Sequence, residues 1–351
     1  MSLKDRLIKN STIDHTAVLT DSKVYGRKDM IPTVVPMINV ALSGRIDGGL
    51  TPGLTVLAAP SKHFKTAFSL LMAAAYLKRH PDAVILFYDS EFGTPESYFT
   101  SFGVPLESVV HTPITDIEQL KFDLMHQLQE IKRGDKVMIV VDSVGNLASK
   151  KEVEDALKQS SAADMTRAKQ LKSLFRMVTP HLTIKDIPMV VVNHVYMTQE
   201  MYSKPIVSGG TGIYYSADNI WIIGRQQDKD DKELKGYHFI INIEKSRYVK
   251  EKSKIPITVN YDSGINRWSG LLDLALEGGY ITKPKQGWYA RVDQETGELG
   301  KNNRAADIVD NNEFWKSILE ETNFAEWIKN KYSIGTGEIL SNDQEEDTDD
   351  Q

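Results

Sequence analysis

The residues best suited to chemistry lie where short apolar segments end. The apolar segment 54–59 runs into Pro60-Ser61-Lys62-His63-Phe64-Lys65-Thr66, and a helical pattern follows. A strand, a tight turn and a Lys-Thr pair at a helix start predict a phosphate-binding loop, because backbone N–H groups and the positive helix end face an anion there. Lys65 would then contact the β- and γ-phosphates of a nucleotide, and the Thr66 hydroxyl would bind Mg²⁺.

This turn departs from the usual phosphate-loop pattern G-x-x-x-x-G-K-[ST]. Ala59 and Phe64 occupy the two glycine positions. Glycine permits a positive φ and a close approach of the backbone, which phenylalanine permits only at an energetic cost. Taken alone, the segment is equally compatible with an ordinary turn between a strand and a helix.

Two carboxylates follow other apolar segments. Glu91 comes two residues after Asp89, at the end of one segment, and Asp142 ends another. Ligands of open α/β sheets bind at the carboxyl ends of the strands. Glu91 would orient the water that attacks a γ-phosphate and Asp142 would hold Mg²⁺, although aspartate there also suits a helix N-cap. Together with Lys65 they predict a site for ATP and Mg²⁺.

The apolar pattern predicts an α/β fold. Continuous apolar runs, typical of parallel strands buried on both faces, occur at 54–59, 84–89, 137–143 and 188–194. Helical patterns alternate with them at 65–80, 116–131 and 164–178. Three later runs follow one another too closely for intervening helices, so we expect them to extend the sheet in antiparallel fashion; they are 219–224, 237–244 and 255–261.

Composition excludes several other classes of protein. The chain has 351 residues, 41% of them hydrophobic and 26% charged, which is ordinary for a globular protein. The absence of cysteine excludes disulfides, cysteine-ligated zinc and iron–sulfur clusters, and fits a reducing cytoplasm. We expect no membrane span and no signal peptide, because no apolar run approaches about 18 residues and the N-terminal residues form no apolar leader.

The negative charge is concentrated at one end. The net charge is −6, and residues 338–351 (EILSNDQEEDTDDQ) contain acids but no base. Such a segment is predicted to be a disordered tail. It would serve either solubility or competition with nucleic acid for a basic groove.

Further segments carry a resemblance that extends over nearly the whole chain. They are VPMINVALSGRIDGGLTPGLTVLAAPSKHFKT, VILFYDSEFGTPESY, VVDSVGNLASK, MTRAKQLKSLFR, NHVYMTQEMYSK, SGGTGIYYSAD, EKSRYVKEKSK, GLLDLALEGGY and QGWYAR. In this order they resemble the RecA family, and most closely its UvsX branch from T-even-type phages. The phosphate loop, with phenylalanine at position 64, is similar to the loop of that branch. The resemblance is weakest in residues 1–30 and 290–351.

The resemblance implies a domain organisation. A helical oligomerisation segment would occupy residues 1–30, with a short amphipathic helix within 2–20. A RecA-type P-loop ATPase core would span 31–268, and a small α+β domain 269–337, before the acidic tail. The N-terminal helix and a strand near 31–36 would dock on the neighbouring protomer of a filament.

The family also implies roles at matching positions. Glu91 matches the catalytic glutamate, and Tyr98 matches the tyrosine that stacks on adenine, although a core aromatic on a short helix is the alternative. His194 stands where RecA proteins carry a glutamine that senses the γ-phosphate; a structural histidine is the alternative. Lys245 and Arg247 match basic residues that reach the neighbour's ATP in the manner of an arginine finger; a solvated basic strand end is the alternative.

Two loops would bind DNA, at about 150–166 and 196–214. The second contains Ser208-Gly209-Gly210-Thr211-Gly212, whose small residues could offer backbone N–H groups to phosphates, although glycine-rich turns are common. Arg167, Lys169 and Lys172 would add positive charge. Contacts to the DNA backbone are independent of base sequence and sensitive to salt.

These expectations describe a DNA-dependent ATPase that forms helical filaments on single-stranded DNA and exchanges strands with double-stranded DNA. It would act in the cytoplasm of a bacterial host if it is phage-encoded. The resemblance implies a single-strand-binding protein and a recombination mediator as helpers. The alternatives are a hexameric RecA-fold helicase and a DNA-binding scaffold that no longer hydrolyses ATP.

Overall fold

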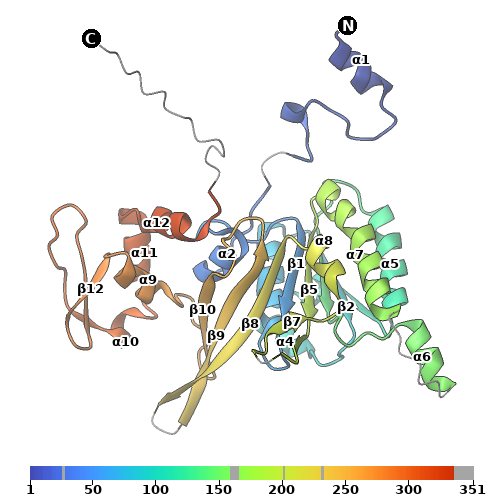
Figure 1. Ribbon diagram of the computed structural model, residues 1–351. Coiled ribbons are helices and arrows are strands. Elements are labelled where there is room, and N and C mark those ends of the chain that lie inside the picture. The colour runs from blue at the N-terminus through green and yellow to red at the C-terminus, as the bar shows by residue number, and fades with distance from the viewer. Residues whose placement is uncertain (26–27, 159–165, 201, 231–232, 336–351) are drawn as a thin grey trace, which may run out of the picture.

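The computed structural model describes residues 1–25, 28–158, 166–200, 202–230 and 233–335, and Figure 1 shows how its elements are arranged. The predicted acidic tail, 338–351, lies outside the described residues, as do residues 159–165 of the first predicted DNA loop.

Within the described parts of the chain, nine strands form one central sheet in the order β11-β10-β9-β8-β1-β5-β4-β2-β3. Their bounds are β1 Gly53–Ala58, β2 Val84–Asp89, β3 Val109–Pro113, β4 Val137–Asp142, β5 Pro188–Asn193, β8 Asn219–Asp230, β9 Glu233–Ser246, β10 Lys254–Asn260 and β11 Gly264–Ile265. The pairs from β8 through β1, β5, β4 and β2 to β3 are parallel. The predicted parallel core is therefore confirmed.

Helices cover both faces of this sheet (Figure 1). Successive strand residues face opposite layers, so that Phe87 of β2 packs on one side and Tyr88 on the other. One layer contains α2 Pro36–Ser43 and α3 Lys65–Arg79, and the other contains α5 Ile117–Glu130, α7 Thr166–Lys185 and α8 Thr211–Ser216. Shorter elements complete the core: α4 Glu96–Ser101, α6 Lys150–Leu157, η2 Leu106–Ser108, β6 Val195–Met197 and β7 Pro205–Val207.

A small α+β domain follows the core, as predicted. Its elements are α9 Leu271–Glu277, β12 Ile281–Lys285, β13 Trp288–Arg291, β14 Asn303–Arg304, α10 Ala305–Ile308, α11 Asn312–Glu321 and α12 Phe324–Tyr332. Buried Trp315, Phe324 and Ile328 belong to the same apolar cluster as α2 and α3. This domain therefore shares a continuous core with the sheet.

The N-terminal segment forms a helix that projects from the body (Figure 1). Helix α1 spans Leu3–Asn10 and is closed by a capping box between Ser2 and Asp5; a short turn, η1, follows at Leu19–Asp21. The side chains of Leu3 and Leu7 are each 63% exposed. An apolar stripe on an isolated helix is therefore available for contact.

The prediction of a strand near residues 31–36 is wrong. Ile31 pairs only with Leu50, in an isolated bridge, and Pro36 begins helix α2. Proline suits the first turn of a helix because its missing N–H would have no intrahelical partner there. Gly44, with a φ of 74°, then ends the helix in the left-handed conformation. Proline and glycine eight residues apart were the signal for this helix.

Three other expectations are corrected. Strand β8 joins the sheet parallel to β1, whereas β9 and β10 are antiparallel as expected. The first predicted DNA loop contains helix α6, which is capped by Ser149. The second contains the β6–β7 pair and helix α8. Elements α6, β6, β7 and α8 are short, so their periodicity was hidden among polar residues.

Candidate nucleotide site

The turn between β1 and α3 forms a phosphate-binding loop without glycine. Lys62 and Phe64 adopt left-handed backbone conformations, with φ values of 60° and 61°. The Phe64 ring lies 5.1 Å from that of Phe239 and 6.0 Å from that of Phe68, measured between ring centroids. Aromatic packing can offset the cost of a positive φ. The departure from the usual pattern is therefore compensated by contacts from α3 and β9.

Lys65 begins α3 and turns its ammonium back onto the loop. Its Nζ donates to the carbonyls of Ala59, at 3.1 Å, and Pro60, at 2.8 Å. Burial lowers the pKa of Lys65, and the negative charges of Glu91 and Asp142 oppose that effect. The lysine and the two carboxylates are thus close enough to interact, as predicted. Phosphate oxygens could take the place of the two loop carbonyls.

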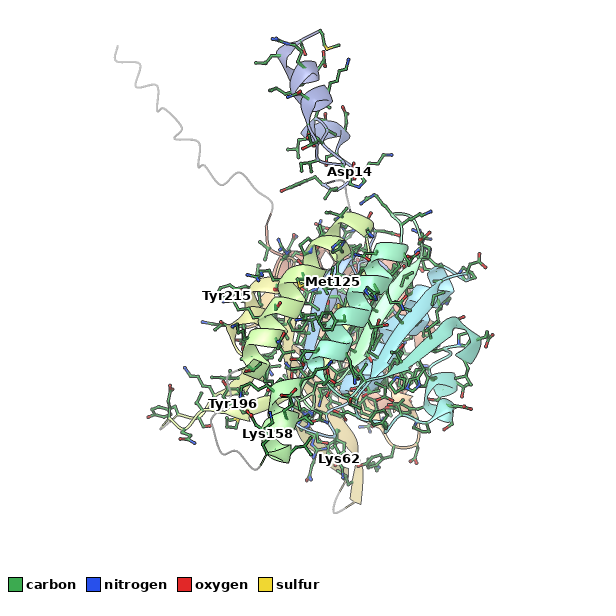
Figure 2. The ribbon with its side chains drawn as sticks, turned by 90° about the vertical axis from the view of Figure 1, so that its right-hand side faces the viewer. Asp14, Lys62, Met125, Lys158, Tyr196 and Tyr215 are labelled. Carbon is green, nitrogen blue, oxygen red and sulfur yellow. The ribbon has the colours of Figure 1, made fainter. Side chains whose placement is uncertain are left out.

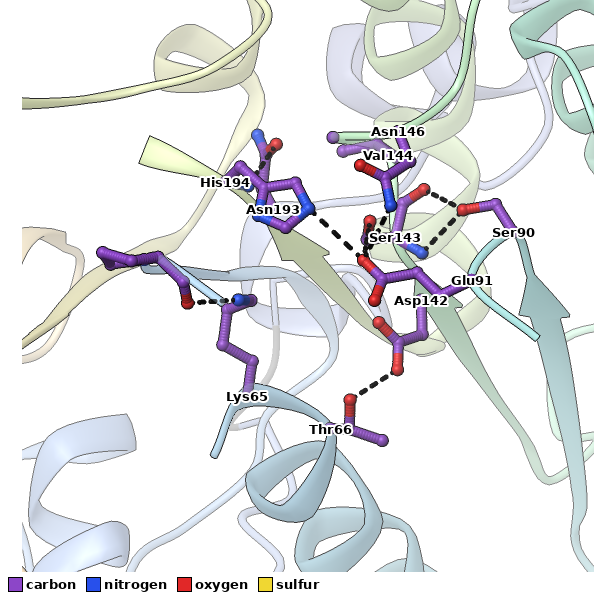
Figure 3. A network of polar contacts seen from close by, with 12 residues as sticks. Lys65, Thr66, Ser90, Glu91, Asp142, Ser143, Val144, Asn146, Asn193 and His194 are labelled. Atoms are coloured by element: carbon purple, nitrogen blue, oxygen red, sulfur yellow. Dashed lines mark hydrogen bonds and ion pairs between the residues drawn. The ribbon is translucent and has the colours of Figure 1, made fainter. Parts of the chain in front are cut away.

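Asp142 is buried and incompletely hydrogen-bonded. Its Oδ2 accepts a hydrogen bond of 2.6 Å from the Thr66 hydroxyl (Figure 3), while its Oδ1 is buried without a partner. Burial raises the pKa of Asp142 from 3.8 to about 6, helped by the charges of Glu91 and Asp89 and opposed by the Thr66 bond. A buried carboxylate that lacks a partner favours a cation beside it.

The residues present fit a Mg²⁺ ion. Mg²⁺ prefers oxygen ligands and commonly takes only one or two from the protein, with phosphates and water completing its shell. The unpartnered Oδ1 of Asp142 and the Thr66 hydroxyl supply such oxygens. In the described parts of the chain, no group of three or more acidic, histidine or cysteine side chains could hold a metal unaided. The ion would therefore depend on a bound nucleotide.

Glu91 is oriented by side chains from the next strand ends (Figure 3). Its Oε1 accepts hydrogen bonds from Ser143 Oγ, at 2.7 Å, and from Asn146 Nδ2, at 3.2 Å. His194 Nε2 lies 3.3 Å from the same oxygen but is off hydrogen-bond geometry and has no other partner. The carboxyl ends of β2, β4 and β5 therefore bring Glu91, Asp142 and His194 together. Ser143 and Asn146 were not predicted, although they follow Asp142 by one and four residues in the chain.

One cleft of about 830 Å³ is lined by Lys65, Thr66, Glu91, Asp142 and His194. Tyr98 of α4 borders it and also packs edge-on against Phe102, at 5.3 Å. Burial raises the pKa of the Tyr98 hydroxyl. Of the predicted loop residues, Ser61, Lys62, His63, Phe64, Lys65 and Thr66 line this cleft, while Pro60 contributes its carbonyl to Lys65.

The opposite wall contains residues that the sequence did not indicate. Arg225 of β8 donates from Nη1 to the carbonyl of Lys62 at 3.0 Å. Its guanidinium lies 4.8 Å from the centre of the Tyr237 ring, and Tyr261 also borders the cleft. Only the pairing of β8 with β1 places Arg225 beside the phosphate loop.

Comparison with known proteins agrees with this geometry. The family model of the RecA N-terminal domain matches residues 16–266. The model described as the C-terminal domain of the bacteriophage T4 recombination and repair protein matches residues 268–328. The "Recombination and repair protein" of Enterobacteria phage T4 is 52% identical over 337 residues, which cover 95% of this chain and 86% of that protein.

The chain belongs to the RecA family.

More distant members of the RecA family also match. "Protein RecA" of a Nocardioides species is 25% identical over 297 residues, covering 82% of both chains. "Protein RecA" of Ruegeria pomeroyi is 26% identical over 301 residues, covering 84% of this chain and 83% of that one. The resemblance to this family and to its T4 branch is confirmed.

In this RecA-family chain, Lys245 and Arg247 lie at the opposite end of the strands from the phosphate loop. Lys245 pairs with Ile220, near the amino end of β8, and the phosphate loop follows the carboxyl end of β1. The six residues of β1 separate its ends by roughly 17 Å. Lys245 donates to the Tyr214 carbonyl, and Arg247 forms an ion pair with Asp218. Neither cation is placed to reach the cleft of its own chain.

The predicted DNA contacts divide into surface and internal residues. Lys169, Lys172, Gly210 and Thr211 are exposed and remain candidates. Arg167 instead donates to the carbonyls of Leu147, Val144 and Gly145. These bonds hold the segment after β4, and the expected contact of Arg167 with DNA stays a prediction.

The glycine-rich turn is also partly structural. The N–H of Ser208 is not free for a phosphate, because it donates to the His194 carbonyl at 2.9 Å. Gly209 has a φ of 98°. Gly212 is buried, and a Cβ there would lie 2.7 Å from the Lys172 Cα. The expectation that this whole stretch presents free N–H groups is therefore wrong at Ser208, and the close approach of Lys172 explains the glycine at position 212.

The two segments expected to bind DNA lie toward the same end of the molecule. Figure 2 labels Lys158 and Tyr196 there, together with Lys62 of the phosphate loop. The side chains of Tyr196 and Tyr202 are 52% and 79% exposed. Exposed aromatic rings are suited to stacking on unpaired bases.

Proposed function

We propose that this chain is an ATP-dependent recombinase, a DNA-dependent ATPase that assembles on single-stranded DNA and pairs it with homologous double-stranded DNA. The observation that carries the proposal is the convergence of Lys65, Glu91 and Asp142 on one cleft of a RecA-family fold. The similarity to the recombination and repair protein of Enterobacteria phage T4 supports it.

The proposed ATPase chemistry depends mainly on positioning. Lys65 and the N–H groups of the phosphate loop would hold the β- and γ-phosphates. Thr66 and Asp142 would hold Mg²⁺, which neutralises developing phosphate charge when it is bound. Glu91, fixed by Ser143 and Asn146, would orient the attacking water and accept its proton. Tyr98 would stack on the adenine.

Lys245 and Arg247 would act on the ATP of a neighbouring protomer. Their place near the amino end of β8, at the opposite end of the strands from the phosphate loop, supports a role outside the cleft of their own chain. Cations supplied in trans stabilise the charge of the transition state. ATP at such an interface would favour one filament geometry, to which the exposed apolar stripe of α1 would contribute a further contact.

His194 would couple ATP to DNA. Its imidazole faces Glu91, and its carbonyl accepts the N–H of Ser208. The side-chain amide of Asn193 donates to the Ser208 carbonyl at 2.8 Å. At the other end of the same segment, Lys245 holds Tyr214 of α8. A change at the γ-phosphate would therefore bias the second DNA segment, which is a coupling between linked affinities.

The remaining expectations are proposals of the same kind. A single-strand-binding protein and a recombination mediator would assist assembly, in the cytoplasm of a bacterial host. None of the helices in the described parts of the chain combines the length and apolar character needed to traverse a lipid bilayer. We retain the boundaries 1–30, 31–268, 269–337 and 338–351 for the four regions.

The test is a homologous pairing assay with single-stranded DNA and a homologous duplex. Wild type should pair them only with ATP and Mg²⁺, and Lys65→Ala should fail to pair them whether or not ATP is present. Electron microscopy of the wild-type complex should show helical filaments, whereas closed rings would favour the helicase.

A DNA-stimulated ATPase assay separates the recombinase from the scaffold. Glu91→Gln should bind ATP with little change, because Lys65 and the loop are untouched, and should hydrolyse it far more slowly. If wild type and Glu91→Gln are equally inactive, the non-hydrolysing scaffold is the correct function.

A further inference from the structure

A second carboxylate holds the turn that carries Glu91. Asp89 ends β2 and is 5% exposed. Its Oδ1 accepts the backbone N–H groups of Glu91, at 2.9 Å, and Phe92, at 2.8 Å. Phe92 has a φ of 55°, which a residue other than glycine adopts only with outside support. The direction of Glu91 therefore depends on how the Asp89 carboxylate is held.

His111 holds the other oxygen of that carboxylate. It lies on β3 beside Phe87 of β2, and alternation along a strand places Phe87 and Asp89 on the same face. Its Nε2 is 3.2 Å from Asp89 Oδ2. Because a carboxylate only accepts, Nε2 must carry the hydrogen. The imidazole also stacks on the Phe87 ring, with centroids 6.2 Å apart and planes 29° apart, which fixes its orientation.

We propose that His111 is a positioning residue for Glu91. Through Asp89 it prevents rotation of the carboxylate that ties down the Glu91 turn, and so keeps Glu91 directed at the γ-phosphate. The inference rests on the proposed ATPase function. His111 makes no contact with the phosphate loop and is absent from the lining of the nucleotide cleft, so its effect is on turnover and not on ATP affinity.

The variants exploit the exposure of this histidine. Its side chain is 51% exposed, so replacement leaves no cavity in the core. His111→Ala removes the donor, whereas His111→Gln offers an amide hydrogen at a similar reach. His126→Ala is the matched control, because His126 is exposed on α5, remote from the turn.

The experiment measures kcat and KM for ATP on single-stranded DNA with the full chain. His111→Ala should lower kcat about tenfold, the scale of one oriented hydrogen bond, with KM for ATP within about twofold because the phosphate loop is intact. His111→Gln should recover most of the loss, and His126→Ala should match wild type. In a Glu91→Gln background, His111→Ala should have no further effect on the residual kcat.

Three results would overturn the inference: wild-type kcat in His111→Ala, a rise in KM as large as the fall in kcat, or no recovery in His111→Gln. Its failure is distinguishable from failure of the proposed function. If Glu91→Gln is inactive and His111→Ala is normal, only the positioning role is wrong. If Glu91→Gln retains full kcat, the catalytic role of Glu91 is wrong.

Discussion

Phe64 offers the sharpest test of how a phosphate loop forms without glycine. Its φ of 61° costs about 1–2 kcal/mol in a residue with a Cβ. Its ring forms aromatic pairs with Phe239 and Phe68, each contributing about 0.5–1.5 kcal/mol, and partial burial adds about 1 kcal/mol. The ring therefore outweighs the backbone cost, and the loop keeps its shape.

Two substitutions separate the contribution of ring packing from the cost of the positive φ. Phe64→Ala loses the ring and keeps the unfavourable φ, so it should destabilise the protein by about 2–4 kcal/mol. Phe64→Gly loses the ring but removes the backbone cost, so it should be more stable than Phe64→Ala by about 1–2 kcal/mol. Thermal unfolding without nucleotide measures both, at roughly 1–2 °C per kcal/mol for a chain of 351 residues.

A matched control removes a phenylalanine elsewhere. Phe122 on α5 is 57% exposed, so Phe122→Ala should change stability by no more than about 0.5 kcal/mol. Equal stability of Phe64→Ala and Phe64→Gly would refute the claim of backbone cost. Wild-type stability in both would refute the claim that ring packing holds the loop.

Three further outcomes follow from the site. Because burial raises the pKa of Asp142 to about 6, its contribution to stability is present below about pH 4 and is lost as the pH rises through about 6. Calorimetry without metal or nucleotide should therefore show that the free energy of unfolding of Asp142→Asn rises relative to that of wild type, by up to about 3 kcal/mol across that pH window. A difference in stability that does not change with pH would contradict the raised pKa. If the cations act in trans, an equal mixture of Lys65→Ala and Arg247→Ala should regain ATPase activity at about a quarter of the interprotomer sites, whereas an inactive mixture would contradict action in trans. A Cβ on Gly145 would lie 2.2 Å from His194 Cδ2, so Gly145→Ala should reduce the stimulation of ATPase by single-stranded DNA more than the basal rate; an equal loss of both would separate His194 from coupling.

The parallel core and the principal site residues could be predicted from the chain alone. Predominantly apolar runs without polar alternation at β1, β4 and β5 indicate strands buried on both faces. Since parallel strands end at one edge, Lys65, Glu91 and Asp142 had to meet there. Prediction of this kind succeeds because a strand that is buried on both faces shows it in its own unalternating apolar residues.

Other features depend on which strands become neighbours. No local pattern shows that β8 runs parallel to β1, which places Arg225 on the phosphate loop. Likewise, the pairing of β3 with β2 brings His111 to Asp89, although the two are 22 residues apart in the chain. The same is true of Phe239, whose ring supports Phe64.

By itself, the order of apolar and polar residues determined the parallel strands β1, β2, β4 and β5, the edge where they end and the charged groups carried there. The tertiary structure alone decided which distant side chains support those groups. It also decided which aromatic rings pack on Phe64 and so stabilise a phosphate loop without glycine. The physical reason is that hydrophobic periodicity acts over a few neighbouring residues, whereas strand order is settled by packing the whole sheet between its two helical layers.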